Sequence, residues 1–126
     1  MKNITLLLSL FAFLILSPKS MAQEEVPKEL LLSTLNSVAH LNLEKEPLDQ
    51  LLEYNEEFVD RVYEILESDQ EDKQKKQLMK ALAYTREKEL RGFLSKHKTN
   101  KYLKLMEDEM RPLTRKEKLL KPLAKG

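Results

Sequence analysis

The sequence has no cysteine and only two glycines among its 126 residues. Without cysteine, a lipoprotein anchor and a disulfide framework are both excluded, so the folded part must hold together by packing alone. Glycine supplies the backbone conformations that tight hairpin turns and phosphate-binding loops require. A sheet fold and a glycine-loop nucleotide enzyme are therefore both disfavoured, and an all-α fold is the class that these absences leave.

One long apolar run is present, and it is too short to be a membrane span. Lys2 precedes apolar residues at 4–16, about 13 positions, whereas a spanning helix needs about 20. Pro18 ends the run. Small residues, Ser20 and Ala22, then stand at the two positions that signal peptidase reads before a cut at Gln23. We therefore predict a cleavable signal peptide over 1–22 and a protein that reaches the periplasm or is secreted. No stable membrane insertion is expected after cleavage.

Acidic and basic residues are divided between the two halves of the chain that follow this leader. Residues 23–72 hold 15 acids and 3 bases, a net charge of −12, whereas residues 73–126 hold 17 bases and 6 acids, a net charge of +11. Opposite fields attract, so we expect the two halves to lie against each other, within one chain or across a homodimer, in a salt-sensitive way. Because the acidic half would repel phosphate, and because of export, nucleic acid is not an expected partner.

Apolar residues recur at helical spacing and predict a helical domain over 23–112. About four helices are expected within it, over 27–41, 47–66, 68–94 and 101–112. The second is the clearest, because its apolar side chains share one face and its acids fill the opposite face. Ser68 and Glu71 form a capping-box pattern, which predicts the start of the third helix.

The last residues, 113–126, are expected to form a basic, flexible tail. Pro112 should stop the fourth helix, because proline lacks the backbone N–H that a helix interior needs. Pro122 then limits any helix that follows to about two turns.

Two short segments, 51 positions apart, precede predicted helices with related sequences: 43–47 reads LEKEP and 94–98 reads LSKHK. Together with the leader, the size and the helix order, they resemble the Spy and CpxP group of small periplasmic proteins, whose repeated Leu-Thr-x-x-Gln motif occurs at comparable helix starts. Glu44 and Pro47 replace the threonine and glutamine in the first segment, as Ser95 and Lys98 do in the second. The resemblance implies a bent helical hairpin that dimerises into a cradle and either shields unfolded clients or restrains an envelope-stress sensor.

No catalytic, cofactor-binding or metal site is predicted. His40 and His97 are the only histidines, and the side chains within reach one turn away are Glu44 and Lys101. One histidine with one carboxylate is a weak set of metal ligands. The glutamates of the second predicted helix are interpreted as a solvated face, because no apolar pocket surrounds them.

Two polar residues interrupt the apolar stripes. Asn55 lies at the centre of the second helix's face, where a lone asparagine can fix register and partner number. Arg86 either pairs with Glu89 or extends its stem along apolar surface to water. An exposed apolar groove that holds unfolded segments is the third possibility. The residues predicted to bind a partner are Leu51, Asn55, Phe58, Val62, Leu82, Arg86, Leu90 and Phe93.

Four lysines, Lys73, Lys75, Lys76 and Lys80, begin the third predicted helix. No aromatic residues alternate with them to stack nucleic-acid bases, so pairing with the acidic half is favoured over binding of lipid or nucleic acid. The leading prediction is an exported, dimeric, non-enzymatic protein that binds other polypeptides in a chaperone-like or envelope-stress role. An accessory or inhibitory adaptor of one envelope protein is the first alternative. An unrecognised enzyme or metal sensor is the second.

Overall fold

The computed structural model describes residues 26–124, so the predicted signal peptide lies outside the described residues. Every regular element in the described range is helical, which confirms the all-α class for this part of the chain. The elements are α3 (Lys28–Leu35), η1 (Ala39–Leu41), α4 (Lys45–Leu66), α5 (Asp72–Leu90), α6 (Lys96–Glu109), α7 (Arg111–Lys116), η2 (Lys118–Leu120) and α8 (Lys121–Ala124).

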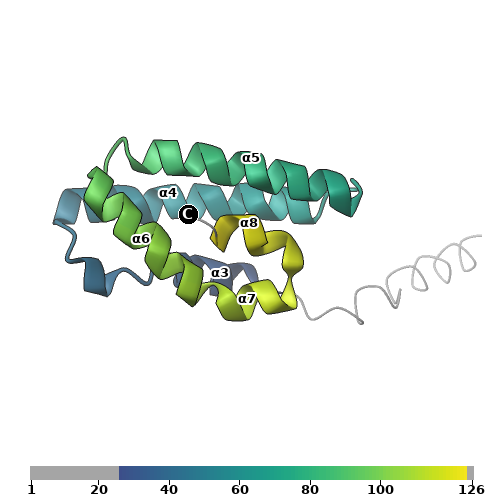
Figure 1. The fold of residues 1–126 in the computed structure, drawn as a ribbon, viewed down its shortest axis with the longest axis horizontal. Helices are drawn as coiled ribbons and strands as arrows, with labels where there is room; N and C mark the ends of the chain where they lie inside the picture. Colours follow the sequence, from purple (N-terminus) through teal and green to yellow (C-terminus); the bar gives the residue numbers. More distant parts are fainter. Residues whose placement is uncertain (1–25, 125–126) are drawn as a thin grey trace, which may run out of the picture.

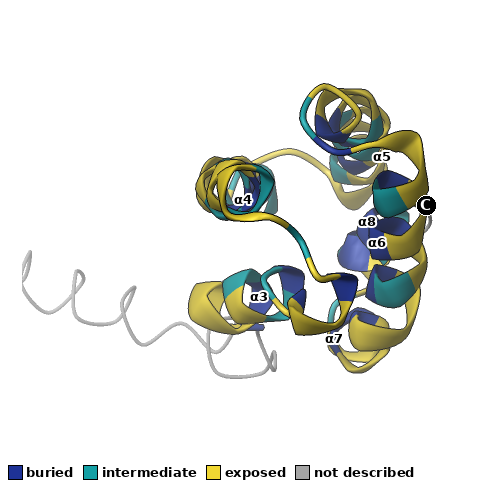
Figure 2. Ribbon diagram, turned by 90° about the vertical axis from the view of Figure 1, so that its left-hand side faces the viewer, coloured by how far each residue is buried: buried dark blue, intermediate teal, exposed yellow. Residues whose placement is uncertain are grey.

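The two longest helices, α4 and α5, run antiparallel beside each other, and the shorter helices cover their inner faces (Figure 1). Helix α3 packs against α4 and α6, while α8 packs against α5 and α6. Viewed end-on, the helices surround one core, with buried residues facing inward and exposed residues outward (Figure 2). The apolar stripes of α4 and α5 are therefore covered by other parts of the same chain.

Helix α4 follows the sequence pattern most closely. Leu51, Phe58 and Val62 recur at helical spacing and are at most 2% exposed, and the acids of the opposite face are exposed. The helix ends at Leu66, as predicted, and starts at Lys45, slightly before Pro47. Proline is tolerated there, because the first turn of a helix has no intrahelical acceptor for its missing N–H.

The corner between α4 and α5 is built differently from the prediction. The Ser68 hydroxyl donates to the Ile65 carbonyl at 2.8 Å, so this serine closes α4. The predicted capping box is therefore wrong, and Glu71 is the N-cap of α5. The Lys75 ammonium donates to the Leu66 carbonyl at 2.7 Å, which places a cation where the dipole of α4 favours positive charge.

The break between the third and fourth long helices covers 91–95, so it lies nearer the N-terminus than the expected 95–100. Helix α5 ends at Leu90, and α6 already starts at Lys96, because the Ser95 hydroxyl accepts the Lys98 N–H at 3.1 Å and caps the new helix. The Lys98 ammonium also donates to the Leu41 carbonyl at 2.6 Å. The first predicted helix is divided in the structure, since α3 ends at Leu35 and η1 follows.

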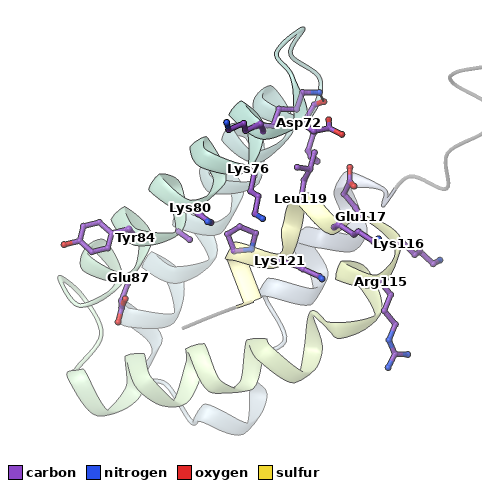
Figure 3. A pocket seen from close by; sticks show the side chains of 16 residues that line it. Asp72, Lys76, Lys80, Tyr84, Glu87, Arg115, Lys116, Glu117, Leu119 and Lys121 are labelled. Carbon is purple, nitrogen blue, oxygen red and sulfur yellow. Dashed lines mark hydrogen bonds between the residues drawn. The ribbon is translucent and has the colours of Figure 1, made fainter.

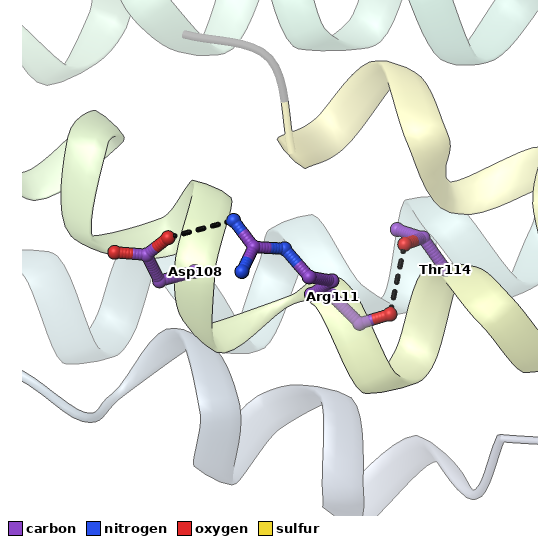
Figure 4. A network of polar contacts seen from close by, with 3 residues as sticks. All are labelled: Asp108, Arg111 and Thr114. Carbon is purple, nitrogen blue, oxygen red and sulfur yellow. Dashed lines mark hydrogen bonds and ion pairs between the residues drawn. The ribbon is translucent and has the colours of Figure 1, made fainter.

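The C-terminal segment is folded through residue 124, which differs from the flexible tail expected over 113–126. Helix α6 ends at Glu109, before Pro112 as predicted, and Pro112 then stands in the first turn of a new helix, α7. The Arg111 guanidinium pairs with the Asp108 carboxylate at 2.9 Å and its carbonyl accepts the Thr114 hydroxyl at 3.0 Å, which shapes the turn from α6 into α7 (Figure 4). Three leucines then anchor the segment in the core: Leu113, Leu120 and Leu123.

Substitution of one of these anchors tests the packing of the segment. Leu120→Ala should lower the free energy of unfolding by about 2–5 kcal/mol, because Leu120 is fully buried and its truncation leaves a cavity. The neighbouring Leu119→Ala, at a partly exposed position, is the matched control and should cost less. Urea denaturation followed by circular dichroism measures both. Equal losses for the two variants would contradict the described packing.

Candidate functional site

The residues predicted to bind a partner lie mostly inside the chain's own core. Of the eight, six are at most 4% exposed: Leu51, Asn55, Phe58, Val62, Arg86 and Leu90. Leu82 and Phe93 are partly buried against the same core. The structure therefore brings the predicted set together, but as core residues. The open apolar groove expected from the two stripes is closed here by α3, α6 and α8.

The polar members of that set meet at the hydroxyl of Tyr102. This hydroxyl donates to the Leu35 carbonyl at 2.7 Å and accepts from Arg86 Nη2 at 2.7 Å and from Asn55 Nδ2 at 3.4 Å. Asn55 also donates to the Asn36 side chain at 2.8 Å. One buried phenol thus joins α6 to α4, α5 and the C-terminal end of α3.

The Arg86 guanidinium lies among aromatic rings. Its central carbon is 4.3 Å from the ring centroid of Phe58 and 5.4 Å from those of Tyr54 and Tyr102. Neither predicted environment holds, because Arg86 is 4% exposed and no ion pair to a carboxylate is formed by it within 26–124. Cation–π attraction is worth about 2 kcal/mol in such a desolvated place and offsets part of the cost of the buried charge.

Burial also keeps the phenols of this cluster protonated. It raises the pKa of Tyr102, and it raises the pKa of Tyr54 to about 12, although the nearby Arg86 charge acts in the opposite direction on both. A protonated Tyr102 is what the geometry requires, since only the O–H form donates to the Leu35 carbonyl.

Removal of the Tyr102 hydroxyl should destabilise the fold strongly. Tyr102→Phe leaves Arg86 and the Leu35 carbonyl without this partner, at a cost of about 1–3 kcal/mol or more. Adding Arg86→Met should restore part of the loss, because no unpaired charge remains in the core. Urea denaturation gives the values, with Tyr84→Phe as the exposed control. A Tyr102→Phe variant as stable as Tyr84→Phe would show that the cluster does not hold the helices together.

The raised pKa of Tyr54 predicts alkaline destabilisation. Between about pH 10 and 12, tyrosine in the unfolded chain loses its proton while Tyr54 in the folded protein keeps it, so the free energy of unfolding falls as the pH rises. Tyr54→Phe should make this fall shallower over the same range. Urea denaturation of both proteins at several pH values gives the two slopes, and identical slopes would contradict the assigned pKa.

A groove between α5 and the C-terminal helices is the second notable feature of the structure (Figure 3). Its volume is about 1180 Å³. Eight basic residues line it: Lys73, Lys75, Lys76, Lys80, Arg115, Lys116, Lys118 and Lys121. Three acidic residues also line it: Asp72, Glu87 and Glu117. We call this the basic groove.

The two walls of the basic groove come from segments far apart in the sequence. Lys73, Lys76, Lys80 and Tyr84 are three or four residues apart and therefore share one face of α5. Lys76 and Lys80 point from α5 toward the C-terminal helices (Figure 3). The opposite wall is formed by α7, η2 and α8. Apolar side chains, among them Leu119, lie between the charges, so the groove is amphipathic.

Sequence reasoning found one wall of this groove and missed the other. The lysines of α5 stand out in the sequence, and they are placed together as a helix requires. The sequence predicts a flexible tail for the basic residues of the last segment, and such a tail has no fixed position relative to α5. The sequence signal that indicates these basic residues is the excess of bases over acids within residues 73–126.

Within 26–124, no ion pair joins the acidic half of the chain to the basic half. Three ion pairs are formed within 26–124, and each joins residues of the same half: Lys28 to Asp60, Arg91 to Glu87 and Arg111 to Asp108. Ion pairs between the halves therefore do not neutralise the exposed acids of α4 or the bases of the basic groove, and each surface remains strongly charged. Of the two expected arrangements, the one within a single chain is not formed through ion pairs in this part of the protein.

The two histidines are exposed, and neither lies in the basic groove. In the described part of the chain, no three side chains of the types His, Asp and Glu come together in a way that would hold a metal ion. Over the same residues, no helix combines the length and the apolar character needed to cross a membrane.

Comparison with known proteins adds no relative. No protein-family model, no curated protein and no solved structure matches the chain. The resemblance to the Spy and CpxP group therefore stays a prediction from the sequence, and the function must be argued from the groove itself.

Proposed function

We propose that this protein is an exported, non-enzymatic binding protein that holds an acidic segment of a partner polypeptide in the basic groove. The observation that carries the proposal is the convergence of eight basic side chains, from two distant segments, on one groove with only three acids. Like charges are gathered there against their mutual repulsion, and an acidic partner would relieve that repulsion.

A polypeptide fits the groove better than other anions. Leu66, Ala83, Leu119 and Pro122 lie among the charges, so a partner with both carboxylates and apolar side chains matches the lining. Tyr84 is the only aromatic residue of the lining, which gives nucleic-acid bases little surface on which to stack. Helix α5 lines the groove from Asp72 to Glu87, about 24 Å at 1.5 Å per residue, which is enough for several turns of a bound helix.

This proposal corresponds to the adaptor role, with one defined partner. The chaperone-like role depends on an open apolar face, and in this structure that face is the core. A bent hairpin that dimerises into a cradle would require α3, α6 and α8 to move away from α4 and α5. The folded C-terminal segment, which closes the core and lines the groove, favours the adaptor.

A defined peptide tests the proposal. A labelled peptide of about 20 residues that alternates glutamate with alanine and leucine should bind the purified protein, and fluorescence anisotropy measures its affinity. The double substitution Lys76→Glu and Lys80→Glu should weaken binding about tenfold or more, since two exposed charges in the groove change sign.

The matched control carries Lys101→Glu and Lys104→Glu on the exposed face of α6, away from the groove. It has the same net charge as the groove variant and should keep most of the affinity. A second peptide, with glutamine in place of glutamate, should not bind. Equal affinities of the two variants for the acidic peptide would show that binding follows net charge and does not depend on the groove.

A photoreactive residue in place of Tyr84, which is 63% exposed and lies in the groove lining, identifies the natural partner in the intact envelope. Recovery of one protein in stoichiometric amount is the expected result for an adaptor. A broad mixture of captured proteins would favour the chaperone-like role.

A further inference from the structure

We propose that the acidic partner of the basic groove is the outer face of α4 in a second copy of this chain, so that copies associate head to tail. This inference rests on the proposed function, because it assumes that the groove accepts an acidic polypeptide, and it names that polypeptide.

The outer face of α4 is a continuous acidic stripe. Its six acids are all exposed: Asp49, Glu53, Glu56, Glu57, Asp60 and Glu64. Their spacing of three and four residues keeps them on one side of the helix over about 22 Å. Within 26–124 only Asp60 has an ion-pair partner, the nearby Lys28. The other five carboxylates are exposed and form no ion pair within 26–124.

The groove is the complementary surface. Lys73, Lys76 and Lys80 are exposed and form a stripe of opposite sign along α5, and none of them takes part in an ion pair within 26–124. The C-terminal helices add four more basic side chains on the other wall. A helix that lies in the groove with its acids toward both walls would therefore meet cations on each side.

The acidic face of α4 cannot reach the basic groove of its own chain. End-on, α4 lies on one side of the bundle, while α8, which forms part of one groove wall, lies on the opposite side (Figure 2). Helix α4 also packs against α3 and α5, so its outer face is directed away from the groove of the same chain. The contact must form between copies, with the acidic face of one in the groove of the next.

Such a contact joins two different surfaces, and after one contact has formed one copy retains a free groove and the other a free acidic face. Because α4 and α8 lie on opposite sides of the bundle, two copies cannot form both contacts at once, so association continues into open chains or closed rings. The homodimer expected from the sequence would be only the first step of this series. Because the attraction is between exposed charges, it should weaken with salt.

Complementary variants provide a sharp test. The groove variant carries Lys76→Glu and Lys80→Glu, and the face variant carries Glu53→Lys and Glu57→Lys. In sedimentation velocity at low salt, the wild-type protein should form species larger than a dimer, which dissociate as salt is added. Each variant alone should be monomeric. An equal mixture should give a heterodimer and nothing larger, because each partner has only one intact surface.

Two controls establish that the variants are folded. A single chain with all four substitutions has no intact surface of either kind and should be monomeric, with the helical circular dichroism spectrum of the wild type. Variants with the same charge changes on α6, Lys101→Glu with Lys104→Glu and Glu107→Lys with Glu109→Lys, should associate like the wild type, since those residues lie outside both surfaces.

Three results would overturn the inference. A wild-type protein that is monomeric at every salt concentration contradicts it, and so does one that stops at a dimer. Association that survives both reversals also contradicts it. The glutamate peptide separates the two proposals: if it binds the groove while the protein does not self-associate, the proposed function stands and only the named partner is wrong. If the peptide also fails to bind, both are wrong.

Discussion

The hydroxyl of Tyr102 joins the buried Arg86 guanidinium, the Asn55 amide and the Leu35 carbonyl, and through them four helices. A cation in a core without a carboxylate is costly, and it persists only where hydrogen bonds and polarisable groups compensate. Here one phenol and three aromatic rings provide that compensation. The relative positions of α3, α4, α5 and α6 depend on this arrangement, and so does the position of α5 as a wall of the basic groove.

The sequence predicted the parts of the fold that local pattern determines. Helix α4 follows from its two-sided periodicity, and its exposed acids lie where the pattern puts them. Periodicity shows which face of a helix is apolar, but it does not show what covers that face. For this reason the sequence predicts a partner surface that includes Phe58 and Leu90, although the chain covers both residues itself. Asn55 and Arg86 stand out in the sequence as polar residues within apolar stripes. Their common partner Tyr102 lies 47 and 16 positions away from them, so a local sequence pattern does not identify it.

The C-terminal segment differs most between the sequence prediction and the structure. It contributes both to the stability of the fold and to the candidate site. Leucines interrupted by prolines and surrounded by bases do not show a helical period, so the segment resembled a disordered end. In the fold, Leu113, Leu120 and Leu123 enter the core, and the intervening basic residues consequently face α5 across the groove. The same short stretch therefore closes the core and completes the basic groove, and the sequence pattern alone indicates only one of the groove's two walls.

The separation of charge between α4 and the basic groove makes the protein a strong electric dipole with almost no net charge. Its isoelectric point is consequently a poor guide to its behaviour near charged materials. A cation exchanger and an anion exchanger should both retain it near neutral pH, each through a different side of the molecule. At a surface of phosphate groups, the protein would be oriented with α5 and α8 inward and the acids of α4 outward, displayed to whatever approaches next.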